Sequence, residues 1–134
     1  MSDNRTFTFK KGERMNSKIL IEKLFSGGSK SLSAFPLRIV YMLVDDENLP
    51  TVSLLISVPK KRFKRAVKRN RVKRQIREAY RKNKFILTEA LEKDGKKVAM
   101  AFIWLDNELH DSENVERKVI KLLQITSEKI AQIE

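Results

Sequence analysis

The chain has 134 residues, no cysteine and a formal net charge of +12 at pH 7. This length suits one domain, and the lack of cysteine excludes disulfides and thiolate metal sites. No apolar run approaches the ~20 residues that a membrane-spanning helix needs, and the first residues lack the apolar stretch of a signal peptide. We therefore expect a cytoplasmic protein without membrane contacts, with a polar arm over residues 1–14 and a single domain over residues 15–134.

A short helix is predicted first. Ser17 can cap its start, and Gly27-Gly28 can end it because glycine readily adopts the left-handed conformation. The residues expected on its apolar face are Ile19, Leu20, Leu24 and Phe25. The polar segment 29–34 that follows is expected to be extended.

From Phe35 the apolar pattern has a period of two, which predicts a strand. One side of that strand carries Phe35, Leu37, Ile39, Tyr41 and Leu43, and the other carries Pro36, Arg38, Val40, Met42 and Val44. After an acidic turn, residues 51–58 are predicted to form a second strand, antiparallel to the first. One face of this strand is apolar throughout. The other face is less hydrophobic and carries Ser53, Leu55 and Ser57.

A long basic helix is predicted over residues 64–82. Its apolar stripe consists of Val72, Ile76, Ala79 and Tyr80. Residues 59–84 hold 14 of the 29 basic residues and only one of the 17 acidic residues, Glu78. A charged surface helix usually mixes both signs, so this unbalanced segment indicates binding to a polyanion.

The remainder of the chain predicts a short helix before a turn at Asp94-Gly95, a third strand over residues 98–105, and a final helix. Ser112 is the expected cap of the final helix. The buried stripe expected for that helix is Val115, Val119, Leu122, Leu123, Thr126 and Ile130. The order helix, strands, helix, strand, helix indicates a small two-layer α+β sandwich.

Neither a catalytic nor a metal-binding residue is predicted in the protein. His110 is the only histidine, and its place in a polar turn favours a surface role. The pair Gly27-Gly28 lacks the Lys-Ser/Thr of a phosphate-binding loop. The acidic turns at residues 45–47 and 106–111 could bind a divalent ion weakly, but such turns are far more often only solvated, and no metal site is predicted there. If the chain takes part in catalysis, the chemistry is expected to lie in another molecule.

One spaced motif narrows the function. It runs Ser57-Val58-Pro59-Lys60-Lys61, then a short loop, then Ala66-Val67-Lys68-Arg69-Asn70-Arg71-Val72-Lys73-Arg74-Gln75-Ile76-Arg77-Glu78. An Arg-Asn-Arg triplet alone carries little information, whereas the whole spaced pattern is specific. It resembles the signature of the bacterial ribonuclease P protein component. The order of the predicted elements extends the resemblance over nearly the full chain.

The resemblance implies the accessory protein subunit of a ribonucleoprotein endoribonuclease, inactive alone. Its fold would be ribosomal protein S5 domain 2-like, with a left-handed strand-helix-strand crossover. The partners would be the catalytic RNA, which binds the magnesium, and the 5′ leader of precursor tRNA, but not DNA. The residues implied to bind the RNA subunit are Lys60, Lys61, Arg69, Asn70, Arg71, Lys73, Arg74 and Arg77. The residues implied to bind the leader are Phe25, Pro36, Arg38, Val40 and Ser57.

This sequence departs from the family pattern at several places. Ile21 replaces an aromatic residue, and Pro36 and Arg38 replace more apolar or aromatic ones. The loop 62–65 is one residue longer than expected and lacks the usual glycine. Three alternatives also remain: a ribosomal protein, a DNA-binding regulator and a stand-alone nuclease. The spaced motif disfavours the first, the lack of a helix-turn-helix the second, and the lack of a carboxylate or histidine cluster the third.

Overall fold

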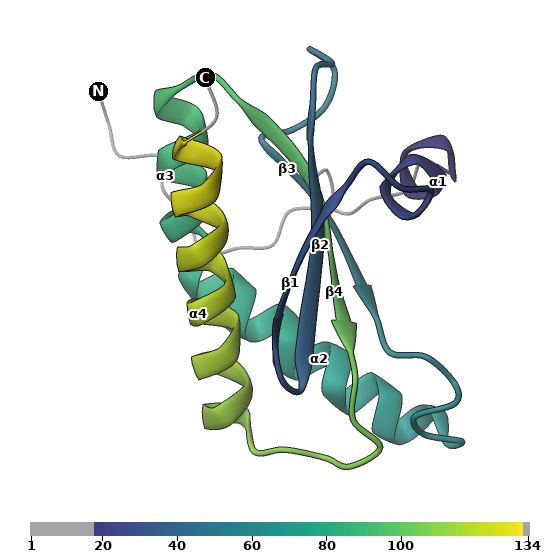
Figure 1. The fold of residues 1–134 in the computed structure, drawn as a ribbon. Helices are drawn as coiled ribbons and strands as arrows, with labels where there is room; N and C mark the ends of the chain where they lie inside the picture. The colour runs from purple at the N-terminus through teal and green to yellow at the C-terminus, as the bar shows by residue number, and fades with distance from the viewer. Residues whose placement is uncertain (1–17, 133–134) are drawn as a thin grey trace.

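The computed structural model describes residues 18–132, which form four helices and four strands (Figure 1). The elements in chain order are α1 (Lys18–Phe25), β1 (Lys30–Ala34), β2 (Leu37–Val44), β3 (Val52–Ser57), α2 (Ala66–Asn83), α3 (Phe85–Lys93), β4 (Lys97–Trp104) and α4 (Ser112–Ala131). The predicted α+β class and the order of its predicted elements are confirmed. The polar arm and Ser17 lie outside the described residues.

The sheet has the strand order β1-β2-β4-β3. β1 and β2 form an antiparallel hairpin, β2 and β4 are antiparallel, and β3 and β4 are parallel. The predicted directions of β2 and β3 are therefore right, but the two strands are not neighbours, because β4 lies between them. The segment expected only to be extended contains a fourth strand, β1.

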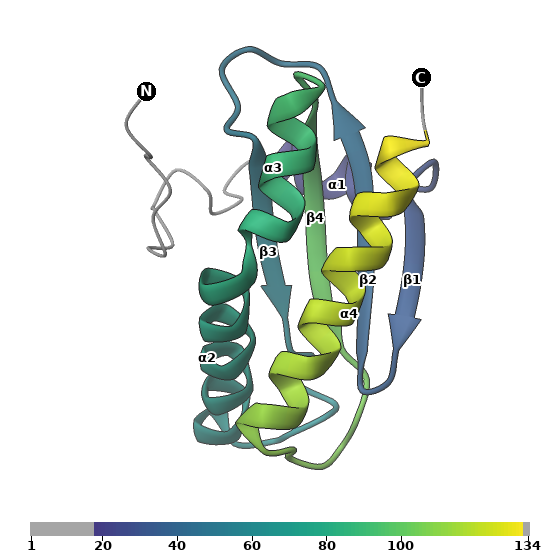
Figure 2. The ribbon, with the colours of Figure 1, turned by 90° about the vertical axis from the view of Figure 1, so that its left-hand side faces the viewer.

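The connection from β3 through α2 and α3 to β4 is a left-handed crossover. In Figure 2 the helices face the viewer, β3 and β4 run downward, and β4 lies to the right of β3. About 98% of such crossovers are right-handed, so the handedness expected from the resemblance is a distinctive feature of this fold. It carries α2 along the β3 edge of the sheet.

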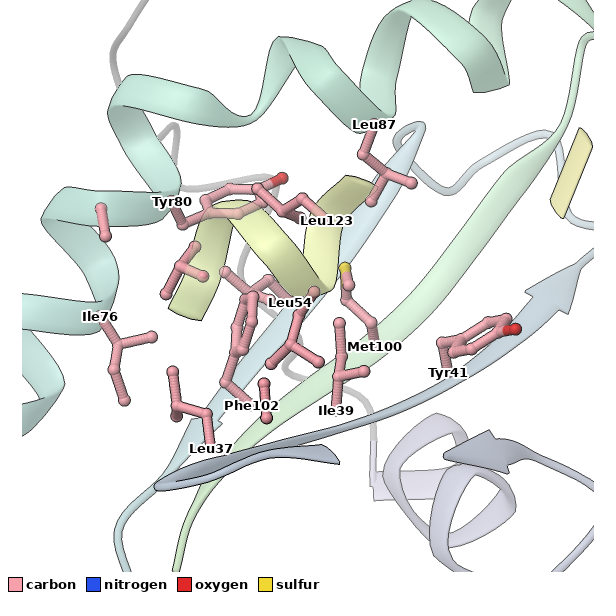
Figure 3. Close-up of a cluster of buried hydrophobic side chains, with 14 of the residues drawn as sticks. Leu37, Ile39, Tyr41, Leu54, Ile76, Tyr80, Leu87, Met100, Phe102 and Leu123 are labelled. Atoms are coloured by element: carbon pink, nitrogen blue, oxygen red, sulfur yellow. The ribbon is translucent and has the colours of Figure 1, made fainter. Parts of the chain in front are cut away.

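The main hydrophobic core lies between one face of the sheet and the layer formed by α2, α3 and α4 (Figures 1 and 3). Large side chains from both layers meet there, among them Tyr80 from α2, Phe102 from β4 and Leu123 from α4. All four residues of the predicted α2 stripe and all six of the predicted α4 stripe are buried. Their burial fixes which faces of the two helices point away from the domain.

Helix α1 lies on the opposite face of the sheet (Figure 1). Leu24 packs there with Val40, Ala99 and Ala101 in a second, smaller buried cluster. The expectation that Ile19 shares this buried face is wrong, because 68% of its surface is exposed.

Two predicted chain turns are confirmed by the backbone conformation, and one predicted cap is wrong. Gly27, Gly28 and Gly95 have positive φ angles, which glycine adopts at little cost. Helix α4 is capped by Asp111, not by Ser112, since the Asp111 carboxylate accepts a hydrogen bond from the Asn114 N–H at 2.7 Å.

None of the described helices is both long and apolar enough to cross a membrane.

Candidate nucleic-acid interface

The surface of α2 that faces away from the core carries most of the basic residues of the motif. Because its apolar stripe is buried, the remaining positions of the helix point to its two flanks and outward. The motif residues Lys60, Lys61, Asn70, Arg71 and Arg74 are exposed, whereas Arg69, Lys73 and Arg77 are half-buried. The structure thus gathers these eight residues on one helix and the loop that precedes it.

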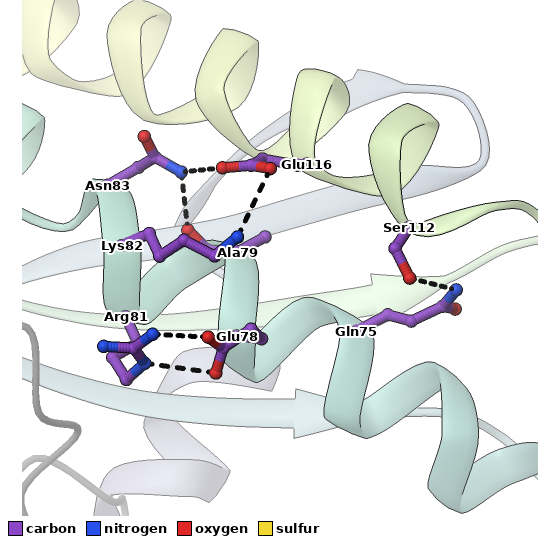
Figure 4. Close-up of polar contacts among 8 residues, drawn as sticks. All are labelled: Gln75, Glu78, Ala79, Arg81, Lys82, Asn83, Ser112 and Glu116. Carbon is purple, nitrogen blue, oxygen red and sulfur yellow. Dashed lines mark hydrogen bonds and ion pairs between the residues drawn. The ribbon is translucent and has the colours of Figure 1, made fainter.

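Ion pairs of α2 gather at its C-terminal end. Glu78 pairs with Arg81, and the Lys82 ammonium lies 3.8 Å from the Glu116 carboxylate of α4 (Figure 4). The hydrogen bond from Arg81 holds the pKa of Glu78 below its ordinary value. Among the described residues, no carboxylate pairs with the five cations Lys68, Arg71, Lys73, Arg74 and Arg77. The positive potential is therefore strongest over the first two-thirds of the helix.

Arg69 makes contacts within the protein that the motif alone does not indicate. Its guanidinium Nη1 donates to the carbonyl oxygens of Phe63 at 2.6 Å and Lys64 at 3.0 Å. Both acceptors lie in the loop before α2. The resemblance implies that Arg69 contacts RNA, but this side chain is engaged in holding the loop.

A second loop, between β4 and α4, holds α2 from the other side. The Gln75 amide Nε2 donates to the His110 carbonyl oxygen at 2.9 Å and to the Ser112 hydroxyl oxygen at 3.1 Å (Figure 4). On the loop before α2, the Arg62 guanidinium donates to the Asn107 side-chain oxygen at 3.4 Å. These contacts fix α2 relative to the start of α4.

His110 has a structural role in that second loop. Its ring nitrogens lie 2.7 Å from the Asp106 carboxylate and 2.9 Å from the Asn114 amide nitrogen, and its ring packs edge-on against Trp104. The hydrogen bond with His110 holds the pKa of Asp106 below its ordinary value. The expected surface position is only partly right, because the side chain is 24% exposed and fully partnered. No local sequence signal indicated these partners.

The face of the sheet that carries α1 is only partly covered. The pairing of the strands places Arg38, Ile103 and Ser57 in one row across β2, β4 and β3. Arg38 is exposed, and the other two are half-buried. Phe25, at the end of α1, is 48% exposed. This row and Phe25 offer a cationic, a hydroxyl, an aliphatic and an aromatic group.

Two of the five residues implied to bind the leader are not available on this surface. Val40 is only 4% exposed because it packs beneath Leu24 of α1. Pro36 is also buried, at the tight turn between β1 and β2. Strand alternation placed both on the side of Arg38, but it cannot show which part of a face a helix covers. Ile103 was missed, because its place beside Arg38 depends on the β2–β4 register.

Comparison with known proteins decides the family. The family model described as Ribonuclease P matches residues 9–127. The chain belongs to the ribonuclease P protein family. This confirms the resemblance and, with it, the expected enzyme class: the protein part of a ribonucleoprotein endoribonuclease.

Relatives and solved structures agree with this family. The chain is 43% identical over 123 residues to the ribonuclease P protein component of Porphyromonas gingivalis W83, covering 92% of this chain and 89% of that protein. It is 40% identical over 110 residues to the ribonuclease P protein component of Chlorobaculum tepidum, covering 78% and 71%. The Thermotoga maritima RNase P protein shares the fold, with a TM-score of 0.66 at 24% identity over 84% of this chain and 96% of that one.

Proposed function

We propose that α2 and its preceding loop bind the RNA subunit of ribonuclease P. The observation that carries this proposal is the row of cations along α2 without carboxylate partners in the described chain, on a helix whose opposite stripe is anchored in the core. Arginine forks match phosphate oxygens bidentately. Asn70 adds both a donor and an acceptor, suited to a base edge or a 2′-hydroxyl. A rigid helix holds these groups at fixed spacing along a folded RNA backbone.

The 5′ leader of precursor tRNA is proposed to lie on the uncovered part of the sheet. Arg38 is exposed there for a phosphate, and Ser57 and Ile103 lie beside it in the same row. Phe25 is exposed at the end of α1 and suits stacking on a base. Such a surface tolerates different leader sequences, since stacking and phosphate contacts do not read base identity.

Cleavage itself is assigned to the RNA subunit with its magnesium ions. Among the described residues, no group of three or more His, Cys, Asp or Glu side chains could hold a metal ion. The contribution of the protein is to hold RNA and leader together, which places the scissile bond through binding. We place this activity in the cytoplasm, where precursor tRNA is the substrate.

The test is cleavage of a precursor tRNA by a bacterial ribonuclease P RNA at low magnesium, with and without this protein. We expect the protein to restore cleavage at the mature 5′ end, because its cations offset the phosphate repulsion that magnesium otherwise screens. The protein alone should leave the precursor uncut. Binding without any stimulation of cleavage would contradict the proposal.

The leader site is tested in the same assay by comparing precursors with long and very short leaders. Wild-type protein should favour the long leader, and Arg38→Ala should reduce that preference while leaving affinity for the RNA subunit unchanged. An equal preference in both proteins would remove Arg38 from the leader site.

A further inference from the structure

The loop before α2 is unusually basic in this chain and is firmly attached to the domain. Residues 60–65 contain five cations and one aromatic residue, Phe63. Phe63 is buried in the main core at 6% exposure. Lys60, Lys61, Lys64 and Arg65 are all exposed. Phe63 therefore anchors the loop in the hydrophobic core, while the cations of the loop face the solvent.

Arg69 holds the second half of this loop, at Phe63 and Lys64. Its single Nη1 nitrogen bridges the carbonyl oxygens of two successive residues, Phe63 at 2.6 Å and Lys64 at 3.0 Å. The bridge therefore ties the first turn of α2 to residues five and six positions earlier in the chain. A lysine at this position keeps the charge, but its ammonium nitrogen lies one bond closer to the backbone than the Arg69 Nη1, so we expect it not to reach both carbonyl oxygens. At the start of the loop, the Arg62 backbone N–H donates to the Pro59 carbonyl oxygen at 3.0 Å and closes a turn.

We propose that Lys64 and Arg65 form an additional phosphate-binding site for the RNA subunit, and that Arg69 is a positioning residue that orders this site. This inference rests on the proposed RNA-binding function. It assigns RNA contacts to two residues outside the family motif and changes the role of a motif residue. Lys64 and Arg65 are exposed, and in the described chain no carboxylate pairs with either. Because the loop is preorganised, binding does not have to order it.

The first measurement is amide hydrogen exchange over residues 60–66 in the free protein, which needs no RNA. Arg69→Lys and Arg69→Ala should both speed exchange in the loop and leave the core strands unchanged. Arg71→Lys and Arg71→Ala are the matched controls, since Arg71 is exposed on the same helix and its side chain forms no hydrogen bond or ion pair within residues 18–132. Unchanged loop exchange in both Arg69 variants would overturn the positioning role, whatever the outcome with RNA.

The second measurement is the salt dependence of binding to a bacterial ribonuclease P RNA. The double variant Lys64→Ala/Arg65→Ala should lower the slope of log affinity against log salt by about 1.5, as expected for two lost phosphate contacts. In the Arg69→Ala background the same double variant should lower the slope much less, because the loop is already displaced. In the Arg71→Ala background, the double variant should lower the salt slope by the same amount as in the wild-type protein.

The possible outcomes separate the two proposals. If the wild-type protein does not bind the RNA, the proposed function fails, while the exchange result still judges the role of Arg69. If the RNA binds and Lys64→Ala/Arg65→Ala has the wild-type slope, the additional phosphate site is overturned. If the Arg69 and loop substitutions act additively, Arg69 contacts RNA directly and the positioning role is overturned. Retention of wild-type affinity by Arg69→Lys would also contradict it.

Discussion

The basic residues of α2 differ in the partners of their side chains. Arg71 and Arg74 point outward without a carboxylate partner in the described chain, whereas Arg69 is bonded to the preceding loop. Arg81 and Lys82 face carboxylates instead. A count of positive charge treats all five alike. The structure divides them into cations without a carboxylate partner in the described chain, a cation bonded to the loop and cations in ion pairs.

Arg71→Ala should weaken binding to the RNA subunit and lower the salt slope by about 1, because one phosphate contact is lost. The matched control is Arg117→Ala, which removes the same charge from the outward side of α4, away from the core-facing stripe. Titrations of labelled RNA at several salt concentrations measure both variants. Equal losses in the two variants would mean that net charge, and not position on α2, determines binding.

Among the elements, α1 depends on a single fully buried side chain. Leu24 is 0% exposed, and its neighbours in the second cluster come from β2 and β4. Leu24→Ala should lower the free energy of unfolding by about 2–5 kcal/mol if α1 unfolds with the domain. Ile19→Ala, at a 68% exposed position of the same helix, should change it by less than about 0.5 kcal/mol. Urea unfolding compares the two.

A smaller effect of Leu24→Ala would have a specific meaning. If α1 detaches without unfolding the domain, the loss of stability is small, and amide exchange speeds up over residues 18–25 alone. An effect of Ile19→Ala as large as that of Leu24→Ala would contradict the placement of α1.

The elements also show what the sequence could and could not predict. The stripe from Val115 to Ile130 was predictable because helical spacing repeats within one element. β1 was missed as a strand because its sequence, Lys30–Ala34, is mostly polar and small and lacks an apolar alternation. The position of β4 between β2 and β3 depends on pairing between distant segments, which no local pattern records. The burial of Val40 and the bond from Arg69 to the loop depend on tertiary contacts in the same way.

At the scale of the whole molecule, the excess charge is concentrated on one side of the fold. The loop and α2 hold the +13 segment, and the rest of the chain has nearly equal numbers of acidic and basic residues. Like charges in such a segment repel one another across distances of about 10 Å at about 0.1 M salt, and across longer distances at lower salt. The folded state is therefore expected to gain stability when this repulsion is screened.

Raising sodium chloride from about 0.05 M to about 0.5 M should raise the midpoint of thermal unfolding, since the Debye length shortens over this range. Arg71→Gln/Arg74→Gln should reduce the gain, because two of the repelling charges are removed. Arg117→Gln/Lys121→Gln on the exposed side of α4 is the control with the same net charge. If the two double variants respond equally to salt, the repulsion is not localised on α2.

The central position of β4 has a consequence for a chain that grows from its N-terminus. β4 is the last strand in the sequence, yet it pairs with both β2 and β3. During synthesis, the basic helix therefore leaves the ribosome before the strand that joins β3 to the sheet and before α4, against which α2 packs. The nascent chain carries its whole polycation before α4, the main packing partner of α2, has been made. The final orientation of the basic helix therefore requires the last third of the chain.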